Sequence, residues 1–267
     1  MSGSQLASNL PFIIVPCFNE EKRLNTSEFI RLAKTKQVNL VFVDDGSSDG
    51  TLKTLRIIQE SSHFVTVETI NSNVGKGEAV RHGLNIAVSR GAQIVGYFDA
   101  DLATPISELI KLINEIQENS KLHGVFGSRI SRLGAQIDRR PVRHYIGRIF
   151  STLAGLVLGI AIYDTQCGAK VFRVSETFIQ AISSPFQSSW LFDIVLLDRI
   201  INNPHPSRRI LADCFLELPL TEWRDVEGST LGVRSALGAS VDLVLIRVRR
   251  HRAIKKGQRQ ASQRRYF

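Results

Sequence analysis

Short apolar segments alternate with longer amphipathic segments through the first half of the chain. The apolar segments predict strands at residues 12–15, 39–43, 64–69, 93–98 and 124–127. The segments between them predict helices at residues 21–34, 49–60, 76–90 and 106–118. Strands that alternate with helices of about ten to fifteen residues indicate βαβ units, and therefore an α/β fold whose mostly parallel sheet has helices on both faces.

The pattern changes after Arg129. A basic segment leads into an uncharged run at residues 149–163. The segments that follow predict a strand at 169–173, a helix at 190–201, a strand at 210–218 and an amphipathic helix at 231–248. We therefore expect one α/β domain over residues 1–230. Residues 231–267 are expected to form an amphipathic helix with a basic tail, a candidate for membrane association. No segment reaches the ~20 apolar residues that span a bilayer.

Composition alters this picture little, but charge adds to it. Hydrophobic residues make up 43% of the chain and charged residues 22%, which is ordinary for a folded, water-soluble protein. The net charge is +9, and residues 247–267 hold nine Lys or Arg and no acid; the other 25 basic residues balance the 25 acids. Such a tail is either a solvated end or a contact for an anionic membrane surface. Because no nucleic-acid-binding motif accompanies it, we expect no nucleic acid partner.

The cysteines and the first residues indicate the compartment. The three cysteines form no CxxC pair, which argues against a disulfide framework and for a reducing environment. Residues 1–9 are polar and carry no basic residue, unlike a signal peptide. We expect a cytoplasmic protein, peripheral on the cytoplasmic face of a membrane.

Two carboxylates, Asp99 and Asp101, follow the predicted strand at residues 93–98. Side chains at i and i+2 of an extended segment point the same way, so the two charges repel unless a cation lies between them or one takes up a proton. Two carboxylates in this spacing are more often a solvated turn or a helix cap. Here, however, they end a buried strand, where α/β sheets bind ligands. We therefore predict an Mg²⁺ or Mn²⁺ site at Asp99 and Asp101, completed by substrate phosphates.

Two further strand-end loops carry groups that suit a nucleotide. Asp44 and Asp45 end the second predicted strand, and they exceed what a turn with a helix cap needs. Their carboxylates could accept hydrogen bonds from a base or a ribose. Gly75-Lys76-Gly77 opens a predicted helix, where backbone N–H groups, the helix dipole and the lysine favour a phosphate. The chain has neither a Walker A motif nor a GxGxxG after its first strand.

These loops occur in the order typical of a known family. The segments that carry the resemblance are residues 16–21, 43–51, 75–77, 99–105 and 127–129. Together they resemble family 2 glycosyltransferases, whose GT-A fold is Rossmann-like with a mostly parallel sheet. Residues 164–172, 190–193 and 222–229 narrow the resemblance to the dolichyl-phosphate glucosyltransferase and polyprenyl-phosphate mannosyltransferase branch. The match covers about residues 10–248 and is specific as a set of motifs.

The resemblance implies a role for each matching residue. The expected nucleotide-sugar-binding residues are Pro16, Phe18, Glu20, Asp44, Asp45, Lys76, Asp99 and Ala100. Asp99 and Asp101 would hold the metal on the diphosphate, and Arg129 would meet phosphate or developing charge. The family commonly has Tyr at the position of Phe18, so a hydroxyl contact would be lost here. Members of this branch often carry spanning helices, which this sequence lacks, so a membrane-anchoring partner protein is among the expectations.

The acceptor decides whether a catalytic base is needed. A hydroxyl acceptor requires a carboxylate base, for which Asp164 and Asp193 are the candidates, although either acid could instead cap a local turn or helix. A prenyl phosphate has a second pKa of about 6, so it is already a nucleophile and needs cations more than a base. Arg129, Arg140 and Arg143 precede the uncharged run, where they could bind that phosphate beside a membrane interface. The alternative for the run is a buried core helix. We expect Asp164 to orient the acceptor.

The predicted activity is inverting transfer of a hexose, with glucose favoured, from UDP-glucose or GDP-mannose to a polyprenyl (dolichyl or undecaprenyl) phosphate. Three alternatives stay open. The chain could be a GDP-mannose-dependent polyprenyl-phosphate mannosyltransferase. It could be a soluble family 2 transferase that acts on a hydroxyl, with Asp193 as its base. It could also be an inactive GT-A domain that serves as a binding module. A nucleotidyltransferase should carry a glycine-rich basic loop after its first strand, where this chain has Pro16-Cys17-Phe18-Asn19-Glu20.

Overall fold

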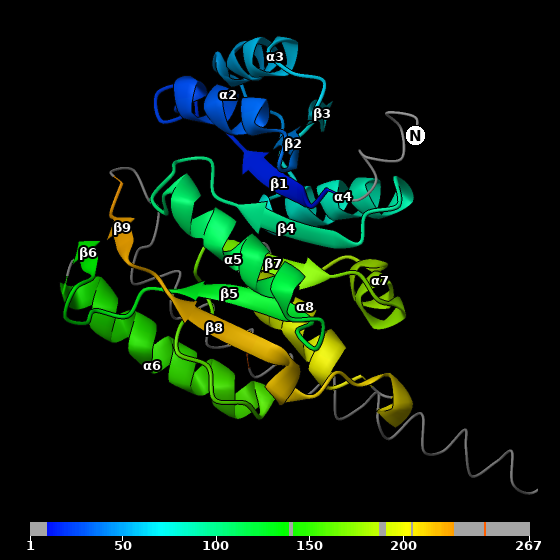
Figure 1. Ribbon diagram of the computed structural model, residues 1–267, viewed down its shortest axis with the longest axis vertical. Helices are drawn as coiled ribbons and strands as arrows, with labels where there is room; N and C mark the ends of the chain where they lie inside the picture. Colours follow the sequence, from blue (N-terminus) through cyan, green and yellow to red (C-terminus); the bar gives the residue numbers. More distant parts are fainter. Residues whose placement is uncertain (1–9, 139–140, 187–190, 204, 227–242, 244–267) are drawn as a thin grey trace, which may run out of the picture.

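A computed structural model describes residues 10–138, 141–186, 191–203, 205–226 and 243. Within these residues the main sheet has seven strands in the order β3-β2-β1-β4-β7-β5-β8 (Figure 1). The strands are β1 (Phe12–Cys17), β2 (Asn39–Asp44), β3 (Val65–Thr69), β4 (Ile94–Phe98), β5 (Gly124–Ser128), β7 (Ala169–Arg173) and β8 (Phe215–Pro219). β7 runs antiparallel to β4 and β5, while the other pairs are parallel. The expected mostly parallel α/β sheet is confirmed.

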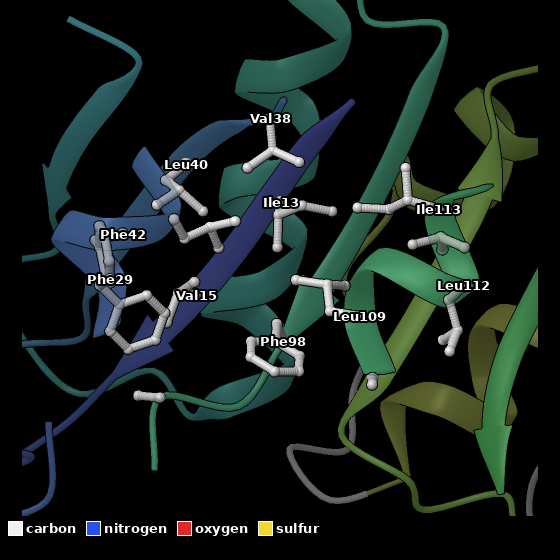
Figure 2. Packing of buried hydrophobic residues seen from close by; sticks show 14 of the residues in the cluster. Ile13, Val15, Phe29, Val38, Leu40, Phe42, Phe98, Leu109, Leu112 and Ile113 are labelled. Atoms are coloured by element: carbon white, nitrogen blue, oxygen red, sulfur yellow. The ribbon is translucent and has the colours of Figure 1, made fainter. Parts of the chain in front are cut away.

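Helices cover both faces of this sheet. On one face lie α2 (Thr26–Thr35), α3 (Thr51–Glu60) and α5 (Ile106–Glu118). On the other face lie α4 (Lys76–Ser89), α6 (Pro141–Leu158), α7 (Glu176–Ile182) and α8 (Phe192–Ile201). Successive strand residues point to opposite faces, so β1 supplies Ile13 and Val15 to the first core and Phe12 and Ile14 to the second. Figure 2 shows Ile13 and Val15 packed among side chains of the first core.

Several element boundaries differ from the sequence prediction. The first helix begins at Thr26 rather than at residue 21, because the Asn25 side chain caps it by accepting from the Glu28 N–H. The uncharged run is not one helix: α6 begins at Pro141, inside the basic segment, and ends at Leu158 before Gly159, whose φ is 77°. Proline is favoured at the first helical position, and a left-handed glycine commonly ends a helix.

Short elements were missed by the sequence prediction. A second sheet pairs β6 (Gln136–Asp138) with β9 (Glu222–Arg224) in parallel. α7 was not predicted, although Ser175 caps it. The strand predicted at residues 210–218 begins only at Phe215, after the 3-10 turns η1 (Pro206–Arg208) and η2 (Ala212–Cys214). Elements of three residues carry too little periodicity to be recognised from sequence alone.

The strand directions bring the candidate loops together. β1, β2, β3, β4, β5 and β8 run one way and β7 runs the other, so the C-terminal ends of the first six meet the N-terminal end of β7 at one edge. The loops after β1, β2, β4 and β5 and the loop before β7 therefore share the sheet edge where such folds bind ligands.

The second predicted unit, residues 231–267, lies outside the described residues except for Leu243. That leucine is buried against the core formed with α4, α6, α7 and α8. The division at residue 230 therefore stays a prediction. Among the described helices, none is long and apolar enough to cross a membrane.

Candidate active site

The Asp99 carboxylate lies between a lysine and a glycine from different elements. Its Oδ1 accepts a hydrogen bond from Nζ of Lys76, the first residue of α4, at 2.5 Å. A Cβ at position 168 would collide with the same carboxylate, so Gly168 is what allows the loop before β7 to approach it. Burial would lower the pKa of Lys76, but Asp99, Asp193 and Asp101 raise it above the ordinary value. Lys76 is thus held at the sheet edge as a cation.

Asp101 and Glu20 add carboxylates to this edge. Burial, and then the charge of Asp99, raises the pKa of Asp101. Burial also raises the pKa of Glu20, with contributions from Asp101 and Asp99, although Arg23 opposes the shift. Within the described part of the chain, Oε2 of Glu20 is buried without a hydrogen-bond partner. Neighbouring carboxylates that repel one another are a donor set suited to a divalent cation.

The protein would not enclose such a cation unaided. In the described ranges, no group of three or more His, Cys, Asp or Glu side chains is placed to hold a metal ion. Asp99 and Asp101 would therefore need further ligands, such as phosphate oxygens of a nucleotide, to complete a metal site.

The loops after β1 and β2 are tied to each other. The backbone N–H of Asn19 donates to Oγ of Ser47 at 3.0 Å, and the N–H of Ser48 donates to Oδ1 of Asn19 at 2.9 Å. The N–H of Glu20 donates to the Thr51 hydroxyl at 2.7 Å. These contacts fix residues 16–20 beside residues 44–51, and the Phe18 side chain is exposed. Of the other predicted residues, Pro16 lies in β1 and Ala100 is buried after β4.

Asp45 supports a neighbouring turn. Its two carboxylate oxygens accept hydrogen bonds from the N–H groups of Val74 and Gly75, both at 2.8 Å, and the residue is buried. Gly75 has a φ of 90°, which favours glycine. Asp45 therefore fixes the turn that presents Lys76. Asp44 is also buried and accepts from the Ser47 N–H at 3.4 Å.

Arg129 and Asp164 form a bidentate ion pair. Nε of Arg129 lies 2.6 Å from Oδ2 of Asp164, and its NH2 lies 2.8 Å from Oδ1. Burial would lower the pKa of Arg129, but Asp164 raises it above its ordinary value. Glu217 of β8 accepts from the Asp164 N–H at 2.8 Å, and the Trp223 ring lies 5.3 Å from the guanidinium carbon. Glu217 and Trp223 therefore both support the pair.

α6 adjoins this pair through one arginine. The Arg148 guanidinium lies 3.6 Å from the centre of the Tyr163 ring and donates to the Tyr163 carbonyl at 3.1 Å. On the outward face of α6, Ile149, Leu153 and Leu156 are 64%, 41% and 69% exposed. Phe150, Ala154, Val157 and Leu158 face the core. The helix thus has apolar side chains on both its buried and its exposed side, so the alternative of a wholly buried core helix is wrong.

Asp193 lies in the first turn of α8 and is only 5% exposed. Its Oδ1 accepts from the Tyr97 hydroxyl and lies 3.0 Å from Nζ of Lys170. Lys170, whose side chain is fully buried, also donates to the carbonyls of Thr165 at 3.0 Å and Cys167 at 2.6 Å. Burial lowers the pKa of Lys170 to about 8, which still leaves the ammonium form in the majority at neutral pH. Burial raises the pKa of Asp193 well above its usual value, and the ammonium group 3.0 Å away opposes that rise.

The sequence-predicted residues are thus only partly brought together. Lys76, Asp99 and Asp101 gather at the end of β4, while Arg129, which follows β5, meets Asp164 in the loop before β7. Arg140 lies outside the described residues, and Arg143 belongs to α6 with its side chain outside them. The roles of Lys170, Tyr97 and Glu217 were not foreseen. For Lys170 the sequence did hold a signal, because a lysine inside the apolar strand Ala169–Arg173 needs buried partners.

Comparisons with known proteins agree with this arrangement. The model of the family described as glycosyl transferase family 2 matches residues 12–177. A dolichyl-phosphate beta-glucosyltransferase of Trichomonas vaginalis is 32% identical over 251 residues, which cover 88% of this chain and 72% of that protein. The Mus musculus dolichyl-phosphate beta-glucosyltransferase is 33% identical over 258 residues, with 89% and 74% covered.

A solved structure shares the fold. Glucosyl-3-phosphoglycerate synthase of Mycobacterium tuberculosis superposes with a TM-score of 0.64 at 17% identity, covering 94% of this chain and 85% of that chain. That enzyme has also been crystallised with Mn²⁺, UDP and glucosyl-3-phosphoglycerate. At this identity the likeness concerns the fold, and it agrees with the expected GT-A architecture.

Proposed function

The chain belongs to glycosyl transferase family 2, and from this premise we propose that it transfers glucose from UDP-glucose to the phosphate of a polyprenyl lipid such as dolichyl phosphate. The names of its relatives support the donor sugar and the acceptor. The observation that carries the proposal is the loop at residues 164–168. One end of this loop, Gly168, rests on Asp99, and the other end, Asp164, pairs with Arg129. A diphosphate-binding edge and an anion-binding arginine therefore flank one short loop.

The donor would bind at the edge formed by the loops after β1, β2 and β4. Glu20, Phe18 and the tied loops 16–20 and 44–51 would surround the nucleoside. Asp99 and Asp101 would hold Mg²⁺ or Mn²⁺, which neutralises charge on the leaving diphosphate when bound. Lys76, already held as a cation at this edge, adds a second positive charge beside the same phosphates.

The acceptor chemistry needs little proton transfer. With a second pKa of about 6, a lipid phosphate is mostly a dianion at neutral pH. Its oxygen would attack the anomeric carbon while the bond from that carbon to the diphosphate oxygen breaks, so the anomeric configuration inverts. Arg129 would bind the acceptor phosphate, and Asp164 would orient the guanidinium. Arg140 and Arg143 remain predicted contributors.

The two candidate bases are both engaged elsewhere. Asp164 contacts Arg129 through both oxygens, and buried Asp193 accepts from Tyr97 and Lys170. A hydroxyl acceptor would require one of these carboxylates to be available for its proton. The observed partners therefore favour a phosphate acceptor over a hydroxyl acceptor.

The lipid would approach along α6. Its exposed face of Ile149, Leu153 and Leu156 lies on a helix that Arg148 links to Tyr163, the residue before Asp164. An apolar helix face at the headgroup level would deliver the lipid phosphate toward Arg129. Peripheral binding to the cytoplasmic membrane face, with the basic tail or an anchoring partner protein contributing, is part of this proposal.

One reconstitution tests the proposal. Purified protein with Mn²⁺ is incubated with UDP-glucose, GDP-mannose or UDP-N-acetylglucosamine and a dolichyl phosphate, and the lipid fraction is analysed by mass spectrometry. We expect a hexosyl-phosphoryl lipid from UDP-glucose, its loss with EDTA, and no product from the matched prenyl alcohol. Product from GDP-mannose alone would replace glucose by mannose. If no donor labels the phosphate lipid, the proposed function is wrong.

A further inference from the structure

Lys170 is a charged residue in the middle of a buried strand. Its neighbours Ala169 and Val171 are buried in β7, and its own side chain is fully buried. A buried ammonium group costs several kcal/mol unless it is well paired, so its partners matter. Nζ reaches the carbonyl oxygens of Thr165 and Cys167, and Oδ1 of Asp193 at 3.0 Å.

Two of these acceptors lie in the loop at residues 164–168. The Thr165 carbonyl is 3.0 Å and the Cys167 carbonyl 2.6 Å from Nζ, so one ammonium group holds the loop at two points. The loop also carries Asp164, which pairs with Arg129, and Gly168, which rests on Asp99. The position of this loop therefore sets the donor side and the acceptor side relative to each other.

The ammonium group is itself fixed from two other elements. Asp193 comes from α8 and Tyr97 from β4. The Tyr97 hydroxyl and the Lys170 ammonium group both donate to Oδ1 of Asp193. The Lys170 ammonium also lies 5.4 Å from the centre of the Tyr97 ring. Asp193 thus has a counter-ion and a hydroxyl donor inside the core, an arrangement that suits a structural carboxylate.

We infer that Lys170, Asp193 and Tyr97 act together as a positioning unit for glycosyl transfer, which rests on the proposed function. The unit holds the loop at residues 164–168 so that Asp99 and the Arg129–Asp164 pair stay at a fixed separation. None of its members is a catalytic residue, because each acts through the loop. In particular, Asp193 serves as the counter-ion of Lys170 and not as a base.

The first test replaces the ammonium group. Lys170→Met keeps an unbranched side chain, one atom shorter, and removes the charge. Val171→Ala is the matched control because Val171 is equally buried on the same strand but faces the opposite core. Hydrogen exchange of the peptide covering residues 163–169 is measured without substrate. We expect exchange there to rise at least about tenfold in Lys170→Met and to stay near wild type in Val171→Ala.

Steady-state kinetics of Lys170→Met provide the second measurement. A loop displaced by an ångström can slow transfer roughly 10²-fold, so we expect kcat of Lys170→Met to fall on that order. KM for the nucleotide sugar should change less than about threefold, because the loops after β1 and β2 are untouched. A fall in folding stability alone would not produce this split. Should Lys170→Met fail to fold, Tyr97→Phe removes only the hydroxyl and should give smaller changes in the same direction.

A double variant separates the two roles of Asp193. Because Asp193 acts through Lys170 in this unit, adding Asp193→Asn to Lys170→Met should slow transfer little further, so the double variant should be about as fast as Lys170→Met alone. A double variant whose loss of kcat is the product of the two single losses, as expected for an independent base, would overturn the inference, and so would wild-type exchange of residues 163–169 in Lys170→Met. If the wild type makes no glycolipid, the proposed function fails, while the exchange measurement still decides whether Lys170 holds the loop.

Discussion

At the scale of single residues, the acids of the ligand edge are distinguished by their partners. Asp45 gives both oxygens to the backbone N–H groups of Val74 and Gly75, whereas Asp99 faces the Lys76 ammonium group. Asp164 is engaged by a guanidinium, and Asp101 carries a raised pKa because of burial and the charge of Asp99. Acids at one sheet edge therefore have different partners, namely backbone N–H groups for Asp45, an ammonium group for Asp99 and a guanidinium for Asp164.

Asp164→Asn tests the orienting role at this scale. The amide can still accept from Arg129 but loses the charge, and hydrogen bonds to charged groups contribute about 1.5–3 kcal/mol. We expect KM for the lipid phosphate to rise about tenfold and kcat to fall less than about tenfold, because orientation suffers while no proton transfer is lost. Steady-state kinetics with a dolichyl phosphate measure both.

The control for this substitution is Glu60→Gln, at an exposed acid at the end of α3. It should leave both constants at their wild-type values. A fall in kcat of about 10³-fold or more in Asp164→Asn, with KM for the acceptor unchanged, would instead identify Asp164 as a base.

At the scale of elements, α5 holds the segment between β8 and β9 through hydrogen bonds from Thr221 to Glu108. Glu108, buried in the first turn of α5, accepts from the Thr221 N–H at 3.2 Å, from the Thr221 hydroxyl, and from Nζ of Lys111 at 2.7 Å. The Arg224 N–H donates to the Ala103 carbonyl, in the loop after β4, at 2.9 Å. This fastening places Trp223 against the Arg129 guanidinium. Glu108 thus helps to place Trp223 beside the Arg129–Asp164 pair.

Glu108→Gln should loosen this attachment. Burial would raise the pKa of Glu108, but Lys111 and Thr221 lower it below its usual value. A carboxyl with a lowered folded-state pKa stabilises the fold fully above its unfolded value of about 4.3, and this contribution is lost as pH falls through the folded-state value. We expect the variant to lose about 1–3 kcal/mol of unfolding free energy at pH 7.

Urea denaturation at several pH values provides the measurement. The difference between wild type and Glu108→Gln should shrink as pH falls below about 4.3, because the wild-type carboxyl then also takes up a proton. Glu118→Gln, at an exposed acid of the same helix, should change little at any pH. A difference that stayed constant with pH would show that packing, and not the charge of Glu108, holds the attachment.

At the scale of the whole molecule, one sheet edge collects both halves of the site. β7 lies between β4 and β5, so its preceding loop touches Asp99 on one side and Arg129 on the other. α6 lies on the same face of the sheet as α8, and Arg148 links it to Tyr163, the residue before Asp164. The body of the chain is formally neutral, and residues 247–267 carry the excess charge. The proposed membrane contact therefore combines an apolar helix face with a basic tail.

Vesicle binding tests this arrangement. Burying a leucine side chain contributes about 1.5–3 kcal/mol, so Leu153→Asp with Leu156→Asp should weaken binding to anionic phospholipid vesicles by at least about tenfold. The matched control is Ile179→Asp, because the side chain of Ile179 in α7 is about as exposed as that of Leu153. Co-sedimentation at fixed salt measures the bound fraction. Binding of the double variant equal to wild type would mean that α6 does not meet the lipid.

Local pattern determined the alternating strands and helices and the place of the strand-end acids. The strand predicted at residues 39–43 is β2, and Asp99 and Asp101 lie where the strand at 93–98 was expected to end. These features follow from periodicity and from the rule that parallel strands end at one edge, both of which can be read along the chain. Family motifs added the expected nucleotide-binding residues.

Tertiary structure alone decided which charges meet. Lys170 reaches Asp193, Tyr97 donates to an aspartate 96 residues away, and Glu217 holds the Asp164 N–H across 53 residues. The insertion of antiparallel β7 between β4 and β5 and the short β6–β9 pair were likewise decided by the tertiary structure. Such contacts depend on strand order, register and side-chain packing between distant segments, which a local pattern does not encode. The sequence thus located the acids, and the fold assigned their partners, because a carboxylate's role depends on what surrounds it in space.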